Sequence, residues 1–311
     1  MQYRILGRTG LEVSEIGIGT MVHAGHFGPM KDAESKNAIE TALELGVNFI
    51  DTSDAYGMGY SEELLGRVLQ PRKDQTILTT KGGNKRLGSP PERDFSPGYL
   101  STALEGSLRR LKRDVIDLYL LHNPTVDVIR NGEALEFLER QREAGKIRFF
   151  GVSINTEEEA LAALEDGRSD AIQIEYNILL QWPEEKVFPL AMQKNVGLIA
   201  RVPLRRGLLS GKFKPDSSFP EGDVRGRLFS GEALAKELAK VEKLHFLIKG
   251  PVTSLVQAAI KFCLRHPAVS TTTPGMRNAQ QARENISASG EPLPEEDLAR
   301  VRELYKNDFR D

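Results

Sequence analysis

The hydrophobic positions of the chain follow a repeated order: a helical stretch, a glycine, and then a short apolar run. The first clear example spaces apolar residues at helical intervals from Ala38 to Leu45, followed by Gly46 and the run 47–50. A glycine at this point allows the left-handed conformation that ends a helix, and the apolar run after it is typical of a buried strand. The same order recurs at 144–152, 167–174 and 195–200.

Eight short apolar runs predict strands, and most are separated by a helix-length segment. They lie at 15–19, 47–50, 76–79, 116–121, 149–152, 171–174, 198–200 and 268–271. Alternating strands and helices of this kind require parallel strands joined by right-handed crossovers. Eight such units can close into a (β/α)8 TIM barrel without edge strands. A doubly wound open sheet is the alternative.

Two features lie outside this alternation. Residues 2–5 and 11–13 flank Gly7-Arg8-Thr9-Gly10, which predicts a small β-hairpin capping the barrel bottom. The segments 82–97 and 204–230 are long, and loops of this length inside a compact fold are more often functional than idle. The full length of 311 residues suits one barrel, so we expect 1–311 to form a single domain.

Composition narrows the class of protein. The net charge of −2 gives no field that would favour nucleic acid, and no window approaches the length of a membrane helix, so we expect neither partner. The single cysteine, Cys263, lies in an apolar run and is expected to be a buried thiol, which suits a reducing cytoplasm. Five histidines without an HExxH or CxxC pattern argue against a metal held by the protein.

Polar side chains follow several predicted strands at the same end. Asp51, Lys81 and His122 follow the second, third and fourth strands, and Tyr56 lies five residues after Asp51. Each alone has a structural interpretation: an ion pair or helix cap, a solvated lysine, a core histidine, a loop aromatic. Together at the end where barrels of this type carry their chemistry, they predict an active site. The next three strands end in Ser153, Gln173 and Arg201.

The four side chains suit proton transfer to a carbonyl oxygen. Tyrosine titrates near ~10, and a neighbouring ammonium lowers that pKa. Lys81 can supply the ammonium and Asp51 can hold it, so that Tyr56 becomes a general acid. His122 can hydrogen-bond the same oxygen. Reduction of a carbonyl also needs a hydride, which implies a nicotinamide cofactor. Since Gly17-Ile18-Gly19 lacks the third glycine of a dinucleotide fingerprint, the cofactor would be bound by another device.

The motifs resemble those of the aldo-keto reductases along nearly the whole chain. The segment 49–57, followed by Ser61-Glu62-Glu63-Leu64-Leu65-Gly66, is similar to the family signature around the catalytic Asp and Tyr. The remaining matches follow in order at 79–81, 117–122, 151–153, 173–177, 203–204, 207–212, 274–277 and 281–285.

This resemblance implies a barrel that binds NADPH in an extended form and reduces small aldehydes or ketones to alcohols. It implies that Ser153 and Gln173 hold the nicotinamide carboxamide. For the phosphates and adenine it implies Lys212, Arg225 or Arg227, Gly275, Arg277, Gln281, Glu284 and Asn285. Further cofactor contacts are implied at Thr20, Met21, Arg201, Pro203 and Leu204.

Three departures from the family pattern stand out. Ile154 separates Ser153 from Asn155, where the family often has Asn directly after the serine. Arg201 occupies a position that is often an aromatic stacked on the nicotinamide. The chain ends soon after a predicted helix at 295–305, so we expect a more open pocket than in members with a long tail. Candidates for its lining are Met21, His23, Phe27 and Trp182.

Three other functions compete with a reductase. A Schiff-base aldolase could use Lys81, but it would not explain the cations at 212, 225, 227 and 277. A metal-dependent hydrolase would need more histidines. An NADPH-binding regulatory subunit, like the potassium-channel β subunits of this family, would be separated from an enzyme by turnover of NADPH with an aldehyde. The substrate and the oligomeric state are left open by the sequence.

Overall fold

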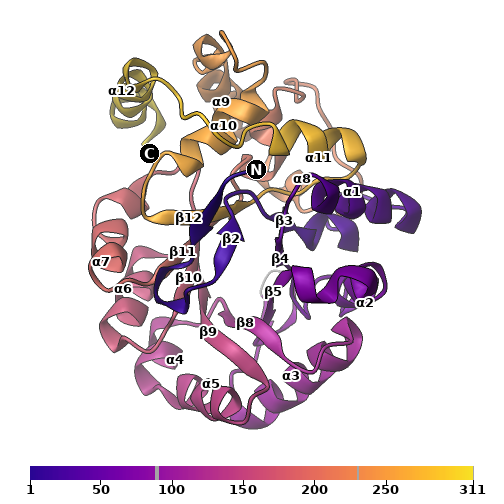
Figure 1. Cartoon of the computed structure of the whole chain (residues 1–311). Helices are drawn as coiled ribbons and strands as arrows, with labels where there is room; N and C mark the ends of the chain where they lie inside the picture. The colour runs from indigo at the N-terminus through magenta and orange to yellow at the C-terminus, as the bar shows by residue number, and fades with distance from the viewer. Residues whose placement is uncertain (88–90, 230, 311) are drawn as a thin grey trace.

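A computed structural model describes residues 1–87, 91–229 and 231–310, and its centre is a barrel of parallel strands (Figure 1). The strands, in the order in which they pair, are β3 (Ile18–Gly19), β4 (Phe49–Asp51), β5 (Ile77–Gly82), β8 (Ile116–His122), β9 (Ile147–Ile154), β10 (Ala171–Glu175), β11 (Gly197–Arg201) and β12 (Val269–Thr273). Parallel bridges from Ile16 to Thr272 and from Gly19 to Gly275 join the first and last strands. The (β/α)8 prediction is confirmed, and the open sheet is wrong.

Helices surround the barrel and alternate with its strands (Figure 1). They are α1 (Asp32–Glu44), α2 (Tyr60–Val68), α3 (Pro97–Leu111), α4 (Val126–Asn131), α5 (Glu133–Glu143), α6 (Glu157–Asp166), α7 (Val187–Gln193), α8 (Arg225–Leu228), α9 (Gly231–Glu242), α10 (Leu255–Leu264), α11 (Ala279–Ile286) and α12 (Glu295–Leu304). Side-chain oxygens cap the amino-terminal ends of several of these helices. Thr156, for example, forms a capping box with Glu159 at the start of α6.

Three of the four glycines expected to follow helices adopt the predicted left-handed conformation. Gly46, Gly145 and Gly167 adopt positive φ values of 91°, 74° and 82°. In the fourth case Asn195 takes the left-handed conformation instead, with φ 51°. Gly197 is needed for packing, because a Cβ there would lie 2.7 Å from Leu6 Cδ1.

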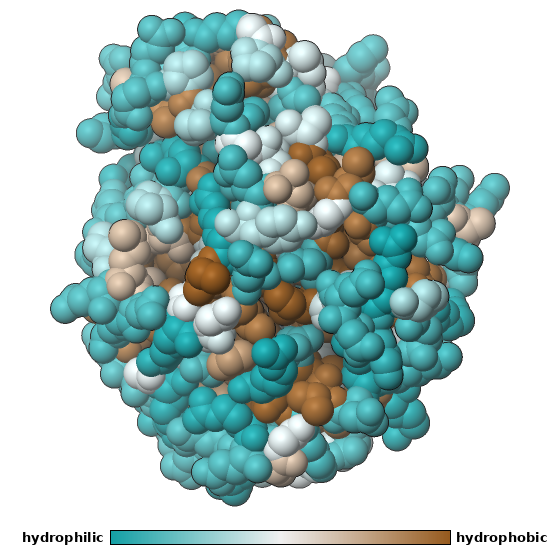
Figure 2. Space-filling view, viewed as in Figure 1, coloured by the Kyte–Doolittle hydropathy of each residue, from teal (hydrophilic) through white to brown (hydrophobic). Residues whose placement is uncertain are grey.

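The predicted hairpin covers the amino-terminal end of the barrel. Its strands, β1 (Tyr3–Ile5) and β2 (Glu12–Ser14), pair antiparallel, and they lie in front of the barrel in Figure 1. The hairpin's Leu6, Leu11 and Val13 pack against barrel residues. Figure 2 shows this face as mostly hydrophilic, with hydrophobic side chains gathered towards its middle.

Alternation along each strand separates the barrel interior from the helix-facing surface. In β8, Leu118 and Leu120 pack with the hairpin inside the barrel, whereas Tyr119 and Leu121 belong to the core between strands and helices. His122 continues the inward series. In three other strands an interior residue is likewise followed, two positions later, by a polar residue at the strand end. The pairs are Phe49 and Asp51, Ala171 and Gln173, and Ile199 and Arg201.

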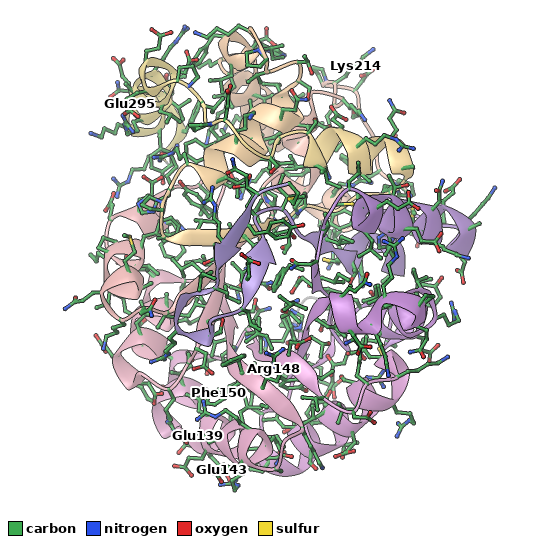
Figure 3. The ribbon with its side chains drawn as sticks, viewed as in Figure 1. Glu139, Glu143, Arg148, Phe150, Lys214 and Glu295 are labelled. Carbon is green, nitrogen blue, oxygen red and sulfur yellow. The ribbon has the colours of Figure 1, made fainter. Side chains whose placement is uncertain are left out.

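The outward residues are covered by the helices. Phe150 of β9 is fully buried, and the guanidinium of Arg142 from α5 lies 4.9 Å from its ring centroid. At the start of the same strand, Arg148 donates a hydrogen bond of 2.7 Å to Asp117 of β8. Figure 3 shows Arg148 and Phe150 on the strand and α5 outside it. Cys263 of α10 is buried and free, as predicted.

Both long segments contain structure that the hydrophobic pattern did not predict. The segment 82–97 includes the antiparallel pair β6 (Asn84–Arg86) and β7 (Glu92–Arg93). The segment 204–230 includes the 3-10 helix η5 (Arg205–Ser210) and α8. Among the described residues, no helix is both long enough and apolar enough to cross a membrane.

The contact between β9 and β10 gives a test of the barrel. A Cβ at Gly151 would lie 1.9 Å from the Ala171 carbonyl oxygen. We therefore expect Gly151→Ala to lower the free energy of unfolding by about 3 kcal/mol, since overpacking must displace backbone. Gly98→Ala is the control, because a Cβ there meets no heavy atom within 4 Å. Urea unfolding measures both, and wild-type stability in Gly151→Ala would contradict this packing.

Candidate active site

The four predicted catalytic residues meet at the carboxyl-terminal end of the barrel. Lys81 Nζ lies 2.8 Å from Asp51 Oδ1 and donates to the Thr52 carbonyl oxygen at 2.7 Å. It also donates to Tyr56 Oη at 3.4 Å. The rings of Tyr56 and His122 form an edge contact with centroids 5.9 Å apart. β4, the loop after it, β5 and β8 thus bring a carboxylate, a phenol, an ammonium and an imidazole together.

The environment keeps Lys81 charged. The side chain is fully buried. Burial opposes the charge, but the Asp51 carboxylate and the Tyr56 hydroxyl outweigh it and raise the pKa of Lys81 above its ordinary value. The site therefore contains a permanent ammonium directly beside the phenol.

The pKa of Tyr56 differs from the expectation. Burial raises the pKa of Tyr56, and the attraction of Lys81, which acts in the predicted direction, offsets only part of that rise. The expected net lowering of the Tyr56 pKa is wrong for the protein without cofactor. Removing a phenolate from water costs more free energy than the Lys81 ammonium, which is shared with Asp51, contributes by attraction. Tyr56 is therefore fully protonated at neutral pH.

His122 is a neutral imidazole. Burial, together with the charges of Lys81 and Arg201, holds the pKa of His122 well below its usual range. Its Nδ1 lies 3.0 Å from the Ser53 hydroxyl oxygen, and the residue lines a cavity above the site.

A chain of hydrogen bonds extends from Asp51 across the rim. Gln173 Nε2 donates to Asp51 Oδ1 at 2.8 Å, and Ser153 Oγ donates to Gln173 Oε1 at 3.1 Å. Both side chains are buried. Ser153 and Gln173 are therefore fixed relative to the carboxylate that holds Lys81.

A cavity of about 410 Å³ opens above these residues. Fourteen of the fifteen expected cofactor contacts line it: Thr20, Met21, Ser153, Gln173, Arg201, Pro203, Leu204, Lys212, Arg225, Gly275, Arg277, Gln281, Glu284 and Asn285. Arg227 does not. It is an exposed residue of α8 outside the cavity lining, so between the two arginines the structure favours Arg225.

Arg201 is held by neighbours. It pairs with Glu175 at 3.5 Å and donates to Asn155 Oδ1 at 2.8 Å. Asn155 also lines the cavity. Glu175 binds Arg205 and Arg206 as well, at 3.0 and 3.2 Å. Arg205 also pairs with Glu237 at 3.5 Å, so three guanidiniums meet two carboxylates and this side of the cavity keeps an excess of positive charge.

Two further arginines, one from the segment after β11 and one from the loop after β12, contact the first loop. Arg225 forms a bidentate pair with Asp223, with an Nε–Oδ1 distance of 2.9 Å, and donates to the Phe27 carbonyl oxygen at 3.1 Å. Arg277 donates to the carbonyls of Phe27 and Pro29. Burial, followed by the charge of Arg225, lowers the pKa of Arg277. The two guanidiniums therefore repel each other, as expected where an anion would be bound.

The predicted pocket lining is half right. Met21 and Phe27 line the cavity, whereas Trp182 packs against the main hydrophobic core and His23 is buried away from the lining. The sequence analysis missed Leu87, Asn123, Val202, Arg206, Phe213 and Val256, which also line it. Leu87, Arg206 and Phe213 belong to the two long segments, so segment length was the signal that could have found them.

Comparison with known proteins identifies the family of the chain. The model described as "Aldo/keto reductase family" matches residues 15–306. The chain belongs to the aldo/keto reductase family.

The similarity of this aldo/keto reductase to known members extends over the whole chain. It is 31% identical over 314 residues to "Uncharacterized oxidoreductase YqkF" of Bacillus subtilis (strain 168), covering 99% of this chain and 98% of that protein. It is 30% identical to "Aldo-keto reductase yakc [NADP(+)]" of Schizosaccharomyces pombe, covering 95% and 89%. The holo structure of aldo-keto reductase AKR11C1 from Bacillus halodurans superimposes with a TM-score of 0.81 at 32% identity, covering 98% and 96%. The protein is therefore an oxidoreductase of this family.

His23 provides a test of the wall beside the site. It is 1% exposed, and neither ring nitrogen has a hydrogen-bond partner among the described residues. Burial, aided by Arg277, lowers the pKa of His23 from 6.5 to about 4. As pH falls below 6.5, the unfolded chain binds a proton that the folded aldo/keto reductase does not, so stability is lost.

We expect His23→Leu to remove that loss. Between pH 7 and about pH 4.5, the wild type should lose roughly 2–3 kcal/mol more unfolding free energy than the variant. His245→Leu, which changes an exposed histidine, should follow the wild type. Urea titrations at both pH values measure the difference, and identical acid sensitivity of wild type and His23→Leu would contradict the assignment.

Proposed function

We propose that the protein is an NADPH-dependent reductase of aldehydes or ketones, with the whole chain as one catalytic domain and Tyr56 as the proton donor. The observation that carries the proposal is the Lys81 ammonium, buried beside the Asp51 carboxylate and the Tyr56 hydroxyl, two residues that line the cavity. A buried acid beside a fixed cation can give up its proton and leave a stabilised anion.

The cavity lining fits a dinucleotide phosphate. Lys212, Arg225 and Arg277 supply cations for phosphate groups, and Ser153 with Gln173 supplies the polar groups that an amide needs. Asn285 and Glu284 would contact the adenine. When bound, the nicotinamide supplies the hydride. The name of the Schizosaccharomyces pombe relative includes NADP(+), which supports this choice of cofactor.

The chain's residues then direct a single proton. The raised pKa of Tyr56 keeps its hydroxyl protonated until a carbonyl oxygen gains negative charge. The Tyr56 Oη–H bond then breaks as the new O–H bond of the alcohol forms, and the phenolate is stabilised by the ammonium of Lys81. His122 donates a hydrogen bond to the same oxygen and orients it.

The same electrostatics argue against an aldolase. A Schiff-base lysine must lose its proton, which needs a lowered pKa. Here Asp51, together with Tyr56, raises the pKa of Lys81 against the effect of burial, and its Nζ already donates to the Thr52 carbonyl. Lys81 is suited to hold a charge and not to attack a carbonyl carbon.

Substitution of the proton donor tests the mechanism. We expect Tyr56→Phe to lower kcat for reduction of a generic aldehyde by at least about a hundredfold, the scale of general acid catalysis. NADPH binding should change little, since Tyr56 is assigned to the carbonyl. The measurement is NADPH absorbance for turnover and fluorescence titration for binding.

Two outcomes would oppose the assignment. Near-wild-type turnover in Tyr56→Phe would exclude Tyr56 as the donor. No turnover of any carbonyl by the wild type, with tight NADPH binding, would favour a cofactor-binding regulatory protein. Lys81→Met retains the phenol but removes the ammonium that lowers its pKa, so the pKa of Tyr56 would rise further and turnover should fall strongly.

Arg277 is proposed to bind the 2′-phosphate, which distinguishes NADPH from NADH. A charge-assisted hydrogen bond contributes roughly 1.5–3 kcal/mol, so the protein should prefer NADPH by about tenfold or more. We expect Arg277→Ala to erode this preference through the Kd of NADPH. Because Arg277 also holds Phe27 and Pro29, loosening of that loop alone would weaken both cofactors equally. Fluorescence titration with each cofactor separates the two results.

A further inference from the structure

Ser53 connects the imidazole of His122 to a second carboxyl group. Ser53 follows β4 and is fully buried. Its Oγ lies 3.0 Å from His122 Nδ1 and 3.2 Å from Asp54 Oδ1, and it accepts a hydrogen bond from the Ala55 amide at 3.1 Å. The Lys81 carbonyl oxygen is farther, at 3.5 Å. A hydroxyl has one proton, so Ser53 can donate to the imidazole or to the carboxyl group, but not to both.

The direction of the Ser53 hydroxyl hydrogen bond determines which nitrogen of His122 carries the imidazole proton. A neutral imidazole has one N–H, and the partner of one nitrogen fixes the state of the other. If Ser53 donates to Nδ1, the proton lies on Nε2. If Ser53 accepts from Nδ1, then Nε2 presents a lone pair.

The protonation state of Asp54 selects between these arrangements. A protonated Asp54 donates its O–H to Ser53 Oγ, Ser53 donates to His122 Nδ1, and Nε2 keeps its hydrogen. When Asp54 loses its proton to solvent, the Ser53 hydroxyl turns to the carboxylate. The imidazole proton then moves from Nε2 to Nδ1 by exchange with water, and the imidazole remains neutral throughout.

We propose that Ser53 and Asp54 are positioning residues that set the tautomer of His122, so that Nε2 is a hydrogen-bond donor only while Asp54 is protonated. The consequence for catalysis rests on the proposed reductase function, because a carbonyl oxygen accepts hydrogen bonds and cannot donate them. Ionisation of Asp54 would replace the donor facing that oxygen with a lone pair that repels it.

The surroundings of Asp54 place this change near neutrality. The groups that face it are Glu62 from α2, Arg110 and Tyr99 from α3, and Tyr119 from β8. Burial, followed by the charge of Glu62, raises the pKa of Asp54 to about 7, against the lowering effects of Ser53 and Arg110. Asp54 is thus protonated below that pH and ionised above it, so reduction should weaken as pH rises.

The direct test is the tautomer of His122 in the complex with NADP⁺. Histidine labelled with ¹⁵N gives ring correlations that distinguish a proton on Nδ1 from one on Nε2, and a His122→Asn spectrum assigns the signal. In the wild type the proton should move from Nε2 at about pH 6 to Nδ1 at about pH 8.5, on either side of the carboxyl group's titration. In Asp54→Asn, whose amide can donate to Ser53 at every pH, it should stay on Nε2.

The kinetic test follows kcat for carbonyl reduction over the same range. The wild type should lose about tenfold in kcat, and Asp54→Asn less than twofold. Asp170→Asn is the matched control: Asp170 is a buried carboxyl group whose pKa is also raised by burial, and it lies at the opposite end of the barrel. It should retain the wild-type pH profile.

Ser53→Ala keeps the proposal testable if Asp54→Asn does not fold. Removal of the hydroxyl should make the tautomer independent of pH with Asp54 intact. An unchanging tautomer in the wild type, or a movement that survives in Asp54→Asn or Ser53→Ala, would overturn the proposal. A protein that reduces no carbonyl but shows the predicted movement would refute the proposed function and support this link. Normal turnover with a tautomer that does not change with pH would support the proposed function and refute this link.

Discussion

The rest of the site depends on one buried ammonium group. Lys81 is fully buried, and a charge in such a place is costly unless it is paired and hydrogen-bonded. The Asp51 carboxylate, the Thr52 carbonyl and the Tyr56 hydroxyl meet this requirement from a single stretch of chain. The position of the phenol is therefore tied to the need to compensate the charge.

The barrel makes this compensation possible through strand parity. Residues two apart in a strand point to the same side, so an inward apolar residue can be followed by an inward polar one at the strand end. Phe49 and Asp51 form one such pair, and Leu120 and His122 form another. The lower interior is thus dry and packed, while the upper interior gathers polar groups from neighbouring strands.

Much of this could be predicted from the sequence because it depends on local order. Short apolar runs indicated all eight strands, and the residues that end them indicated the rim. The net pKa shift of Tyr56 could not be predicted, because it is a balance between burial and Lys81 that only packing determines. The choice between Arg225 and Arg227 was equally inaccessible, since it depends on which side of a four-residue helix faces the cavity.

Features held by long-range contacts were also missed. The pair β6 and β7 lies in a polar segment without an apolar run, so nothing in the hydrophobic pattern marks it. The link from His122 through Ser53 to Asp54 joins residues about seventy positions apart. Ser53 and Asp54 are adjacent in the sequence, but their relation to the imidazole exists only once β8 lies beside β5 and β5 beside β4.

The hairpin at the amino terminus has a consequence for the route by which protons exchange with bulk water. Leu6 and Leu11 close the lower end, and Phe49, Leu118 and Leu120 fill the space above them with no exposed surface. Water therefore has no path to Lys81 from below. In the proposed reaction, every proton that Tyr56 gives to a product would have to be replaced from the cavity side.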